Sequence, residues 1–144
     1  MRGKYIEWVT PLLCGLATLL LFKFVFFVGF VPSESMEPAI KSGSIILGCR
    51  IIGELRRGDV VVFRRDGACL VKRIAGVPGD VIYAADTRLA LSVDDDPVGA
   101  NQALTVPDGC YYVLGDNEDY SIDSRYWDDP FVGRVEIVAK AYGK

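Results

Sequence analysis

Residues 59–74, with the sequence DVVVFRRDGACLVKRI, contain two apolar runs on either side of an Asp-Gly pair. Runs of this length that are rich in valine, isoleucine and phenylalanine are typical of β-strands. The pair Asp66-Gly67 is typical of a tight hairpin turn, because both residue types tolerate the positive φ angles that such a turn requires. The stretch therefore predicts an antiparallel hairpin of strands Asp59–Arg65 and Ala68–Ile74.

The rest of the chain after residue 41 follows the same pattern. Short runs rich in Val, Ile, Leu and Tyr are separated by Gly, Asp and Pro, and no amphipathic helix of ten residues stands out. Many short strands at this spacing predict an all-β domain over residues 32–144, in which a compact antiparallel β-sheet coils on itself. The further strands predicted are Ser44–Arg50, Asp80–Ala84, Leu89–Val93, Cys110–Leu114 and Arg134–Ala141.

A long apolar segment precedes this domain. Residues 8–31, WVTPLLCGLATLLLFKFVFFVGFV, carry one charge, Lys23, and would extend roughly 36 Å as a helix, enough to cross a bilayer. The alternative is a secretory signal peptide, whose apolar region is about 7–15 residues long and ends in a small-residue cleavage site. Length and the lack of such a site favour a retained transmembrane helix. Lys23 leaves a second interpretation open, a shorter span up to Phe22 followed by an interfacial stretch over Phe24–Phe30.

The charges beside the apolar segment predict its orientation. Arg2 and Lys4 precede it, whereas the first charges after it are Glu34 and Glu37. Basic flanks stay in the cytoplasm. We therefore expect a cytoplasmic N-terminus over residues 1–7, a single span of the plasma membrane over residues 8–31, and an extracytoplasmic domain over residues 32–144. Membrane lipid is thus an expected partner, whereas a formal net charge of −3 gives no basic surface for nucleic acid.

The chain contains no histidine, which excludes a Ser-His-Asp triad and any histidine-ligated metal site. A serine nucleophile would need another base, and a buried lysine with a lowered pKa can serve. Ser33 and Ser35 follow the apolar segment directly, and Lys72 lies in the second strand of the hairpin. Such serines more often cap turns, and an isolated strand lysine more often faces solvent. However, neighbouring strand residues face opposite sides, so either Lys72 or Arg73 must point inward.

Four motifs together resemble one family. They are residues 31–38 (VPSESMEP), 58–63 (GDVVVF), 70–80 (LVKRIAGVPGD) and 115–125 (GDNEDYSIDSR). In this order and behind an apolar anchor, they are similar to the sequence boxes of bacterial type I signal peptidases. The resemblance covers nearly the whole chain. Ala39 departs from it, because a threonine is usual there in the family.

The resemblance implies a Ser-Lys dyad. Ser35 would be the nucleophile and Lys72 its general base, while the Ser33 hydroxyl and the Ser35 backbone N–H would form the oxyanion hole. Ser121 would hydrogen-bond the Lys72 amine and orient it. The residues assigned to structural support are Asp116, Asp123 and Arg125. The resemblance implies no cofactor and no metal ion.

The same resemblance implies a serine endopeptidase that removes N-terminal signal peptides from exported preproteins as they emerge from the export machinery. We expect cleavage after a small residue, with another small residue two positions earlier, and an extended substrate beside residues 69–72. The residues expected to line the substrate subsites, because they flank the dyad in sequence, are Val31, Pro32, Met36, Ile40, Leu70 and Val71. The interval between the lysine box and the last box is short, so we expect the family's additional β domain to be reduced to a hairpin around Asp94–Val98.

Three other classes of protein share some of these features. A penicillin-recognising acyl enzyme is excluded because the chain has no Ser-x-x-Lys motif. A self-cleaving repressor-type peptidase would need a DNA-binding module, for which the chain has neither a basic helix nor spare length. A membrane-tethered β module without activity is the remaining alternative, and the presence of Ser35, Lys72 and Ser121 argues against it.

Two smaller features stay open. Cys49, Cys69 and Cys110 lack metal-ligand spacing, and either free thiols or one disulfide among them would fit an extracytoplasmic domain. The three acids Asp94–Asp96 are typical of a solvated loop rather than of a cation site.

Overall fold

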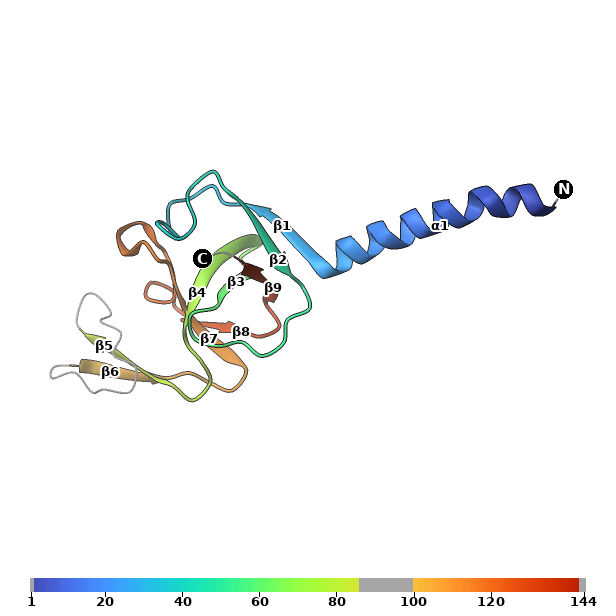
Figure 1. Cartoon of the computed structure of the whole chain (residues 1–144). Coiled ribbons are helices and arrows are strands. Elements are labelled where there is room, and N and C mark those ends of the chain that lie inside the picture. The colour runs from blue at the N-terminus through green and yellow to red at the C-terminus, as the bar shows by residue number, and fades with distance from the viewer. Residues whose placement is uncertain (1, 86–99, 143–144) are drawn as a thin grey trace.

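The computed structural model describes residues 2–85 and 100–142, and consists of one N-terminal helix and a β domain (Figure 1). Helix α1 (Arg2–Val25) extends away from the domain, and the side chains of residues 8–24 are exposed. The part of this helix from Trp8 to Val25 is long and apolar enough to cross a membrane. The predicted arrangement, an all-β domain behind one apolar helix, is confirmed.

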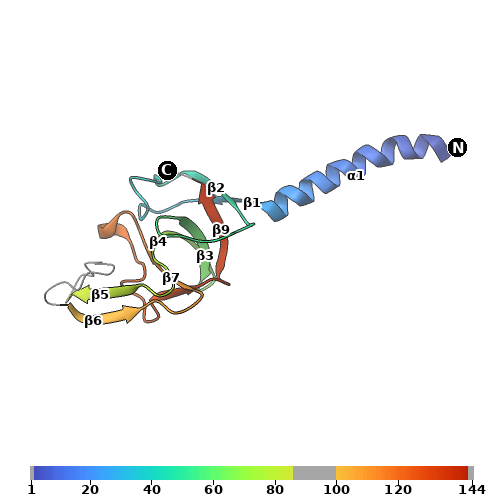
Figure 2. The same ribbon diagram turned by 60° about the horizontal axis from the view of Figure 1, so that its bottom comes forward.

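Seven antiparallel strands form the main sheet, in the order β1-β2-β9-β3-β4-β7-β8. Strand β9 comes from the end of the described chain and inserts between β2 and β3, which joins the two N-terminal strands to the rest of the sheet (Figure 2). The bounds of these strands are β1 Phe26–Phe30, β2 Ile45–Cys49, β3 Val60–Arg65, β4 Ala68–Gly76, β7 Cys110–Leu114, β8 Phe131–Gly133 and β9 Ile137–Tyr142. A separate two-stranded sheet contains β5 (Val81–Ala85) and β6 (Ala100–Thr105).

The predicted hairpin between β3 and β4 is present. Asp66 and Gly67 form its turn with φ angles of 50° and 79°, the left-handed values that favour Asp and Gly there. Arg65 pairs with Ala68 and Val61 pairs with Lys72, so Lys72 lies on the same face of the sheet as Val61. The turn therefore fixes the register that points Lys72 inward.

The apolar segment ends as a strand. Helix α1 stops at Val25, whereas the predicted anchor ran to residue 31, and β1 pairs with β2 over its whole length. Arg50 stabilises the junction, because its backbone N–H donates to Val25 O at 2.8 Å and its Nε donates to Phe26 O at 3.2 Å. Hydrophobicity alone does not separate an apolar helix from an apolar strand, so the sequence placed this boundary too late. The helix also continues past Phe22, where the shorter-span interpretation ended it, and includes Lys23.

Other predictions for the β domain have mixed outcomes. Strands β2, β3, β4, β5, β7 and β9 fall on predicted segments, whereas β1, β6 and β8 were not predicted. The predicted strand Leu89–Val93 and the acidic loop Asp94–Asp96 lie outside the described residues. Cys14, Cys49, Cys69 and Cys110 are all free thiols, so the optional disulfide is not formed.

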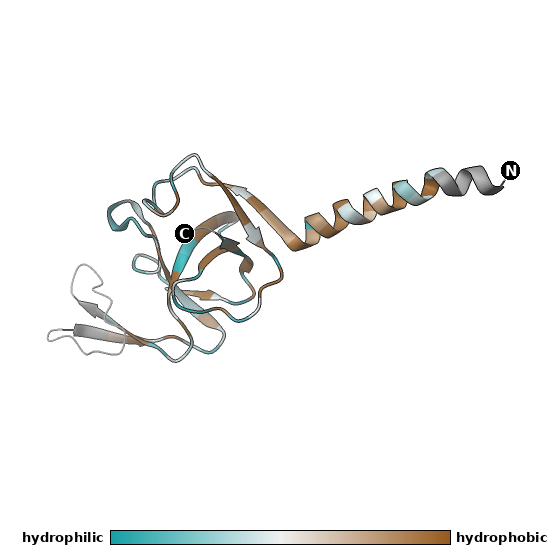
Figure 3. Ribbon diagram, in the orientation of Figure 1, coloured by the Kyte–Doolittle hydropathy of each residue, from teal (hydrophilic) through white to brown (hydrophobic). Residues whose placement is uncertain are grey.

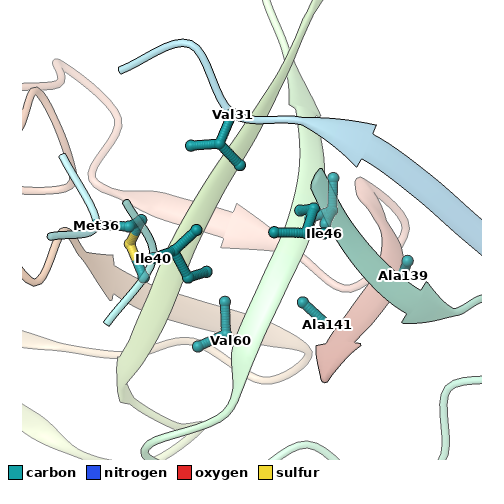
Figure 4. Close-up of a cluster of buried hydrophobic side chains, with 8 residues drawn as sticks. Val31, Met36, Ile40, Ile46, Val60, Ala139 and Ala141 are labelled. Atoms are coloured by element: carbon teal, nitrogen blue, oxygen red, sulfur yellow. The ribbon is translucent and has the colours of Figure 1, made fainter. Parts of the chain in front are cut away.

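Two of the three hydrophobic clusters lie beside the predicted site residues. The first fastens the loop between β1 and β2 onto the sheet (Figure 4) and contains Val31, Met36, Ile40, Ile46, Val60, Val62, Ala139 and Ala141. The second lies on the face that carries Lys72 and contains Leu55, Val61, Phe63, Ile74, Tyr111, Val113, Val132 and Ile137. Lys72 is therefore placed at the border of an apolar core, where its charge is poorly solvated.

Candidate active site

Three segments far apart in the sequence supply the predicted site residues. Ser33 and Ser35 lie in the loop between β1 and β2, and Lys72 lies in β4. The loop from Gly115 to Arg125, which follows β7, carries Ser121 and Asp123. β7 pairs with β4 immediately beyond Lys72, at Arg73 and Ile74, which brings this loop over the lysine.

The loop that carries Ser35 is held against the sheet by its own apolar side chains. Met36 is fully buried, and Ile40 N–H donates to Met36 O at 2.8 Å. A turn bond from Glu37 N–H to Glu34 O, 3.0 Å long, closes the segment around Ser35. Ser35 itself is buried, and its Oγ lies 3.3 Å from Ser33 Oγ. The two hydroxyls predicted to act together are therefore neighbours.

Lys72 points inward and Arg73 points outward, as the alternation along the strand requires. Lys72 is only 3% exposed, whereas Arg73 forms a two-pronged ion pair with Asp116, in which both N···O distances are 2.7 Å. Burial lowers the pKa of Lys72, and Arg125 adds to this effect, while Asp123 and Asp116 oppose it. A general base needs this direction of shift, because a lysine with its ordinary pKa is almost fully protonated near neutral pH.

Ser121 connects Lys72 to a buried carboxylate. Lys72 Nζ donates to Ser121 Oγ at 2.9 Å, and Ser121 Oγ donates to Asp123 Oδ2 at 2.5 Å. A hydroxyl has a single proton, and here Asp123 accepts it, so Ser121 can only accept from the lysine. The lone pair of a neutral Lys72 amine is therefore left for another proton.

Asp123 stays ionised although it is fully buried. Burial alone would raise its pKa, but hydrogen bonds from Arg125, from the Gly115 backbone N–H and from Ser121 lower the pKa below its ordinary value. Arg125 contributes two donors at 2.9 Å each, and its side chain is only 8% exposed. A pair this deeply buried is sensitive to loss of either partner, which costs about 3–5 kcal/mol. The predicted supporting pair is thus in place around Ser121.

Gly115 is a close neighbour of both halves of the site, and sequence reasoning did not select it. A Cβ at this position would lie 2.2 Å from Ser121 Oγ and 2.4 Å from Ser35 O. Both oxygens therefore lie against one glycine, which brings the Ser35 loop beside the Ser121 loop. The only signal in the sequence was a glycine at the start of the last motif.

Asn117 was also missed. Its backbone N–H donates to Ser35 O at 3.1 Å, and its side-chain Nδ2 donates to Glu34 O at 3.1 Å. Nothing in the sequence pattern assigns an asparagine in such a loop to a partner more than 80 residues away.

The residues predicted to line the substrate subsites divide into two groups. Val31, Met36 and Ile40 are buried in the core under the Ser35 loop (Figure 4). Their position follows from the shortness of the loop, because its apolar side chains are the ones that fasten it to β3 and β9. Leu70 and Val71 are partly exposed on β4, and Pro32 is exposed.

The two residues of the predicted dyad are not hydrogen-bonded to each other. Among the described residues, no hydrogen bond joins Ser35 Oγ to Lys72 Nζ, since Ser35 Oγ contacts Ser33 and Lys72 Nζ contacts Ser121. Catalytic hydrogen bonds are often loose without substrate and tighten when it binds.

The part of the chain that the structure describes also has no cluster of Cys, Asp and Glu side chains arranged to hold a metal ion.

Several known proteins are similar to this chain in sequence. The family described as signal peptidase, peptidase S26, matches residues 4–104 and 98–143. The chain is 33% identical over 175 residues to signal peptidase I of Pseudomonas fluorescens, 31% identical over 159 residues to probable signal peptidase I-2 of Synechocystis, and 31% identical over 147 residues to signal peptidase I S of Bacillus subtilis. The alignment with the Pseudomonas protein covers 78% of this chain and 62% of that protein, so the chain spans less than two thirds of it. The alignment with the Synechocystis protein covers 97% of this chain and 70% of that protein, and the alignment with the Bacillus protein covers 86% and 80%. The chain therefore belongs to the signal peptidase family S26, whose serine endopeptidases remove signal peptides from secreted preproteins with a Ser/Lys dyad.

Proposed function

We propose that this chain cleaves signal peptides through an acyl-enzyme, with Ser35 as the nucleophile and Lys72 as the general base. Neutral Lys72 takes the proton of Ser35 Oγ as that oxygen attacks the scissile carbonyl carbon. The Ser33 hydroxyl and the Ser35 backbone N–H donate to the resulting oxyanion, and such donors are each worth on the order of 3 kcal/mol.

The second half of the reaction uses the same groups in reverse. When the tetrahedral intermediate collapses, its C–N bond breaks and the Lys72 ammonium returns its proton to the leaving amine. Lys72 then deprotonates a water molecule, which hydrolyses the ester and releases Ser35 Oγ with its proton restored. The single observation that carries this proposal is the buried Lys72 amine, whose donor bond to Ser121 leaves its lone pair available.

The open edge of β4 supports a substrate that binds as an added strand. Ala68 to Arg73 pair with β3 on one side, whereas β7 pairs on the other side only at Arg73 and beyond. The unpaired edge over residues 69–72 thus offers backbone donors and acceptors to an extended peptide. Val71 is partly exposed on this strand and packs against the cluster that contains Met36, whereas Leu70 faces the other side of the sheet and packs against the cluster that contains Val61. An apolar subsite beside Val71 would accept small side chains and exclude bulky ones.

The exposed apolar surface supports attachment to the plasma membrane. Helix α1 is uncovered and largely apolar over residues 8–24 (Figure 3), and the sheet next to it continues this surface. Cross-strand pairing places Val28 beside Leu47 and Phe30 beside Ile45, and all four side chains are exposed. These four exposed apolar side chains continue the surface of an uncovered apolar helix, and such a surface fits a lipid bilayer. With Arg2 and Lys4 on the cytoplasmic side, the β domain would lie outside the cell, where signal peptides leave the bilayer.

A preprotein cleavage assay tests the activity. The purified full-length chain in detergent is incubated with a preprotein, and the new N-terminus is located by mass spectrometry. We expect one cut after a small residue and no cut by Ser35→Ala. An intact preprotein after incubation with the folded wild-type chain would favour the inactive β module instead. Cleavage that persists in Ser35→Ala would assign the activity to another nucleophile.

Membrane orientation requires a separate measurement. In spheroplasts that express the chain, added protease should digest the β domain, while an epitope at the N-terminus should survive until the membrane is permeabilised. Protection of the β domain would reverse the proposed orientation without affecting the assignment of the dyad.

A further inference from the structure

Asn117 binds the two carbonyl groups on either side of Ser35. Its side-chain Nδ2 donates to Glu34 O and its backbone N–H donates to Ser35 O, both at 3.1 Å. The two bonds reach from the loop after β7 to the loop before β2, which are not neighbours in the sequence. One residue therefore holds both peptide groups that flank the proposed nucleophile.

The Glu34 carbonyl has a particular relation to the oxyanion hole. Glu34 C=O and Ser35 N–H belong to the same peptide group, which is planar and carries its oxygen and hydrogen on opposite edges. A donor that fixes the direction of Glu34 O therefore fixes the direction of Ser35 N–H. A bond to the carbonyl also polarises the amide and strengthens its N–H as a donor.

A second donor to Glu34 O does not replace this role. Glu37 N–H also donates to Glu34 O, at 3.0 Å, and a carbonyl oxygen can accept two bonds. The bond from Glu37 belongs to the turn around Ser35 and moves with it. Asn117 connects that turn to the loop that carries Gly115 and Ser121, so it sets the oxyanion donor relative to Lys72.

We infer that Asn117 is a positioning residue, which aims the Ser35 N–H at the oxyanion and keeps it in register with the Lys72 base. This inference rests on the proposed dyad mechanism. It requires that the side chain of Asn117 affects the transition state more than it affects substrate binding. Misplacement of a catalytic group by about 1 Å costs roughly a hundredfold in rate, and loss of one oxyanion donor costs about 10²–10³-fold.

Two variants of Asn117 and one control test it in the full-length protein. Asn117→Ala removes the donor, and Asn117→Asp keeps the size of the side chain while replacing the donor by an acceptor. Both keep the backbone bond to Ser35 O. Asp119→Ala alters an exposed residue in the same loop and serves as the control. On a soluble peptide with a signal-peptide cleavage site, we expect kcat to fall about 10- to 100-fold in both Asn117 variants, with KM within about twofold of wild type.

A second readout separates positioning from general loosening of the loop. A substrate-like peptide aldehyde forms a tetrahedral adduct with the nucleophile, and its inhibition constant should rise by about the same factor as kcat falls. In Asn117→Ala the rising limb of the pH profile should not move, because this variant leaves the charges around Lys72 unchanged. Thermal unfolding of each variant establishes that it is folded.

Several results would overturn the inference. They are a kcat within twofold of wild type in a folded Asn117→Ala or Asn117→Asp variant, a fall in kcat without weaker aldehyde binding, or an equal fall in Asp119→Ala. Failure of the dyad itself gives a different result, since Ser35→Ala would then retain activity. If Asn117→Ala does not fold, the Asn117→Asp variant alone decides the matter by the same criteria.

Discussion

The Lys72 amine donates a 2.9 Å hydrogen bond to the Ser121 hydroxyl, and this bond does not depend on the charge of the lysine. Both the ammonium form and the neutral amine carry N–H groups, so either form can donate to Ser121. The bond therefore persists while Lys72 gains and loses a proton during the reaction. In the proposed mechanism, Ser121 would therefore orient Lys72 throughout the cycle without selecting its protonation state.

Replacement of this hydroxyl should cost rate and leave the pH dependence in place. We expect Ser121→Ala to lower kcat/KM by about 10- to 100-fold, in the range typical of a lost orientation effect. The rising limb of the pH–rate profile should shift little, because burial and not Ser121 dominates the pKa of Lys72. Steady-state kinetics between about pH 6 and pH 10 measure both quantities. A large shift of the rising limb of the pH–rate profile with an unchanged maximal rate would contradict the orienting role of Ser121.

The buried lysine should reduce stability while it provides activity. Burial lowers the pKa of Lys72 in the folded state, so the charged form disfavours folding. We expect Lys72→Met to abolish cleavage and to raise the free energy of unfolding at pH 7. The gain should be complete below the folded pKa of the lysine and should vanish as the pH rises past its unfolded pKa. Urea unfolding at pH 7 and pH 10 would test this, and an inactive but less stable variant would count against it.

Loss of Arg125 should move the activity to higher pH. Arg125 lowers the pKa of Lys72 and neutralises Asp123, which attracts the ammonium form. In Arg125→Gln the unpaired Asp123 should raise the pKa of Lys72, so the rising limb shifts to higher pH. The same variant should lose about 3–5 kcal/mol of stability, because a buried carboxylate loses its partner. Arg56→Gln is the control, since that arginine is exposed. An equal shift of the rising limb in this control would show that the effect of Arg125 is not local to Lys72.

Gly115 should tolerate no side chain. A Cβ there would overlap Ser121 Oγ and Ser35 O, so the chain must shift either Ser121, which bonds Lys72, or the proposed nucleophile Ser35. We expect Gly115→Ala to lower kcat/KM by at least a hundredfold, with a folded β domain by circular dichroism. Gly53→Ala provides a matched control, because nothing lies within 4 Å of a Cβ at that position. Near-normal activity of Gly115→Ala would mean that the two loops separate easily.

Removal of the helix should separate chemistry from location. Because β1 begins at Phe26, deletion of residues 2–23 leaves the sheet complete. The truncated protein should cleave soluble peptides at close to the wild-type rate, whereas cleavage of membrane-embedded preprotein should fall by orders of magnitude as the effective concentration is lost. Its exposed phenylalanines should still bind lipid vesicles. Equal loss on both substrates would show instead that the helix is needed for folding.

The sequence predicted the sheet and the polar network better than it predicted the boundaries and the close contacts. The Asp66-Gly67 turn fixed a register, and Lys72 beside Arg73 indicated that one of them is inward, so both features followed from local rules. The end of α1 did not, because Phe26–Phe30 is apolar on both faces and only its pairing with β2 makes it a strand. Gly115 and Asn117 were missed for a related reason. Their importance lies in contacts with a loop about 80 residues away, and local patterns contain no information about such contacts.

The direct passage from α1 into β1 fixes the distance between the end of the helix and Ser35. No flexible linker separates the last helical residue, Val25, from the first strand residue, Phe26, and Arg50 bonds to the carbonyl groups of both. Five strand residues at about 3.3 Å each and a short turn then separate the end of the helix from Ser35. If α1 spans the bilayer as proposed, the nucleophile is held at one height above it. Cleavage sites would then be selected by their distance from the membrane as well as by their side chains, and a preprotein with a longer spacer would be cut slowly even if its cleavage residues were ideal.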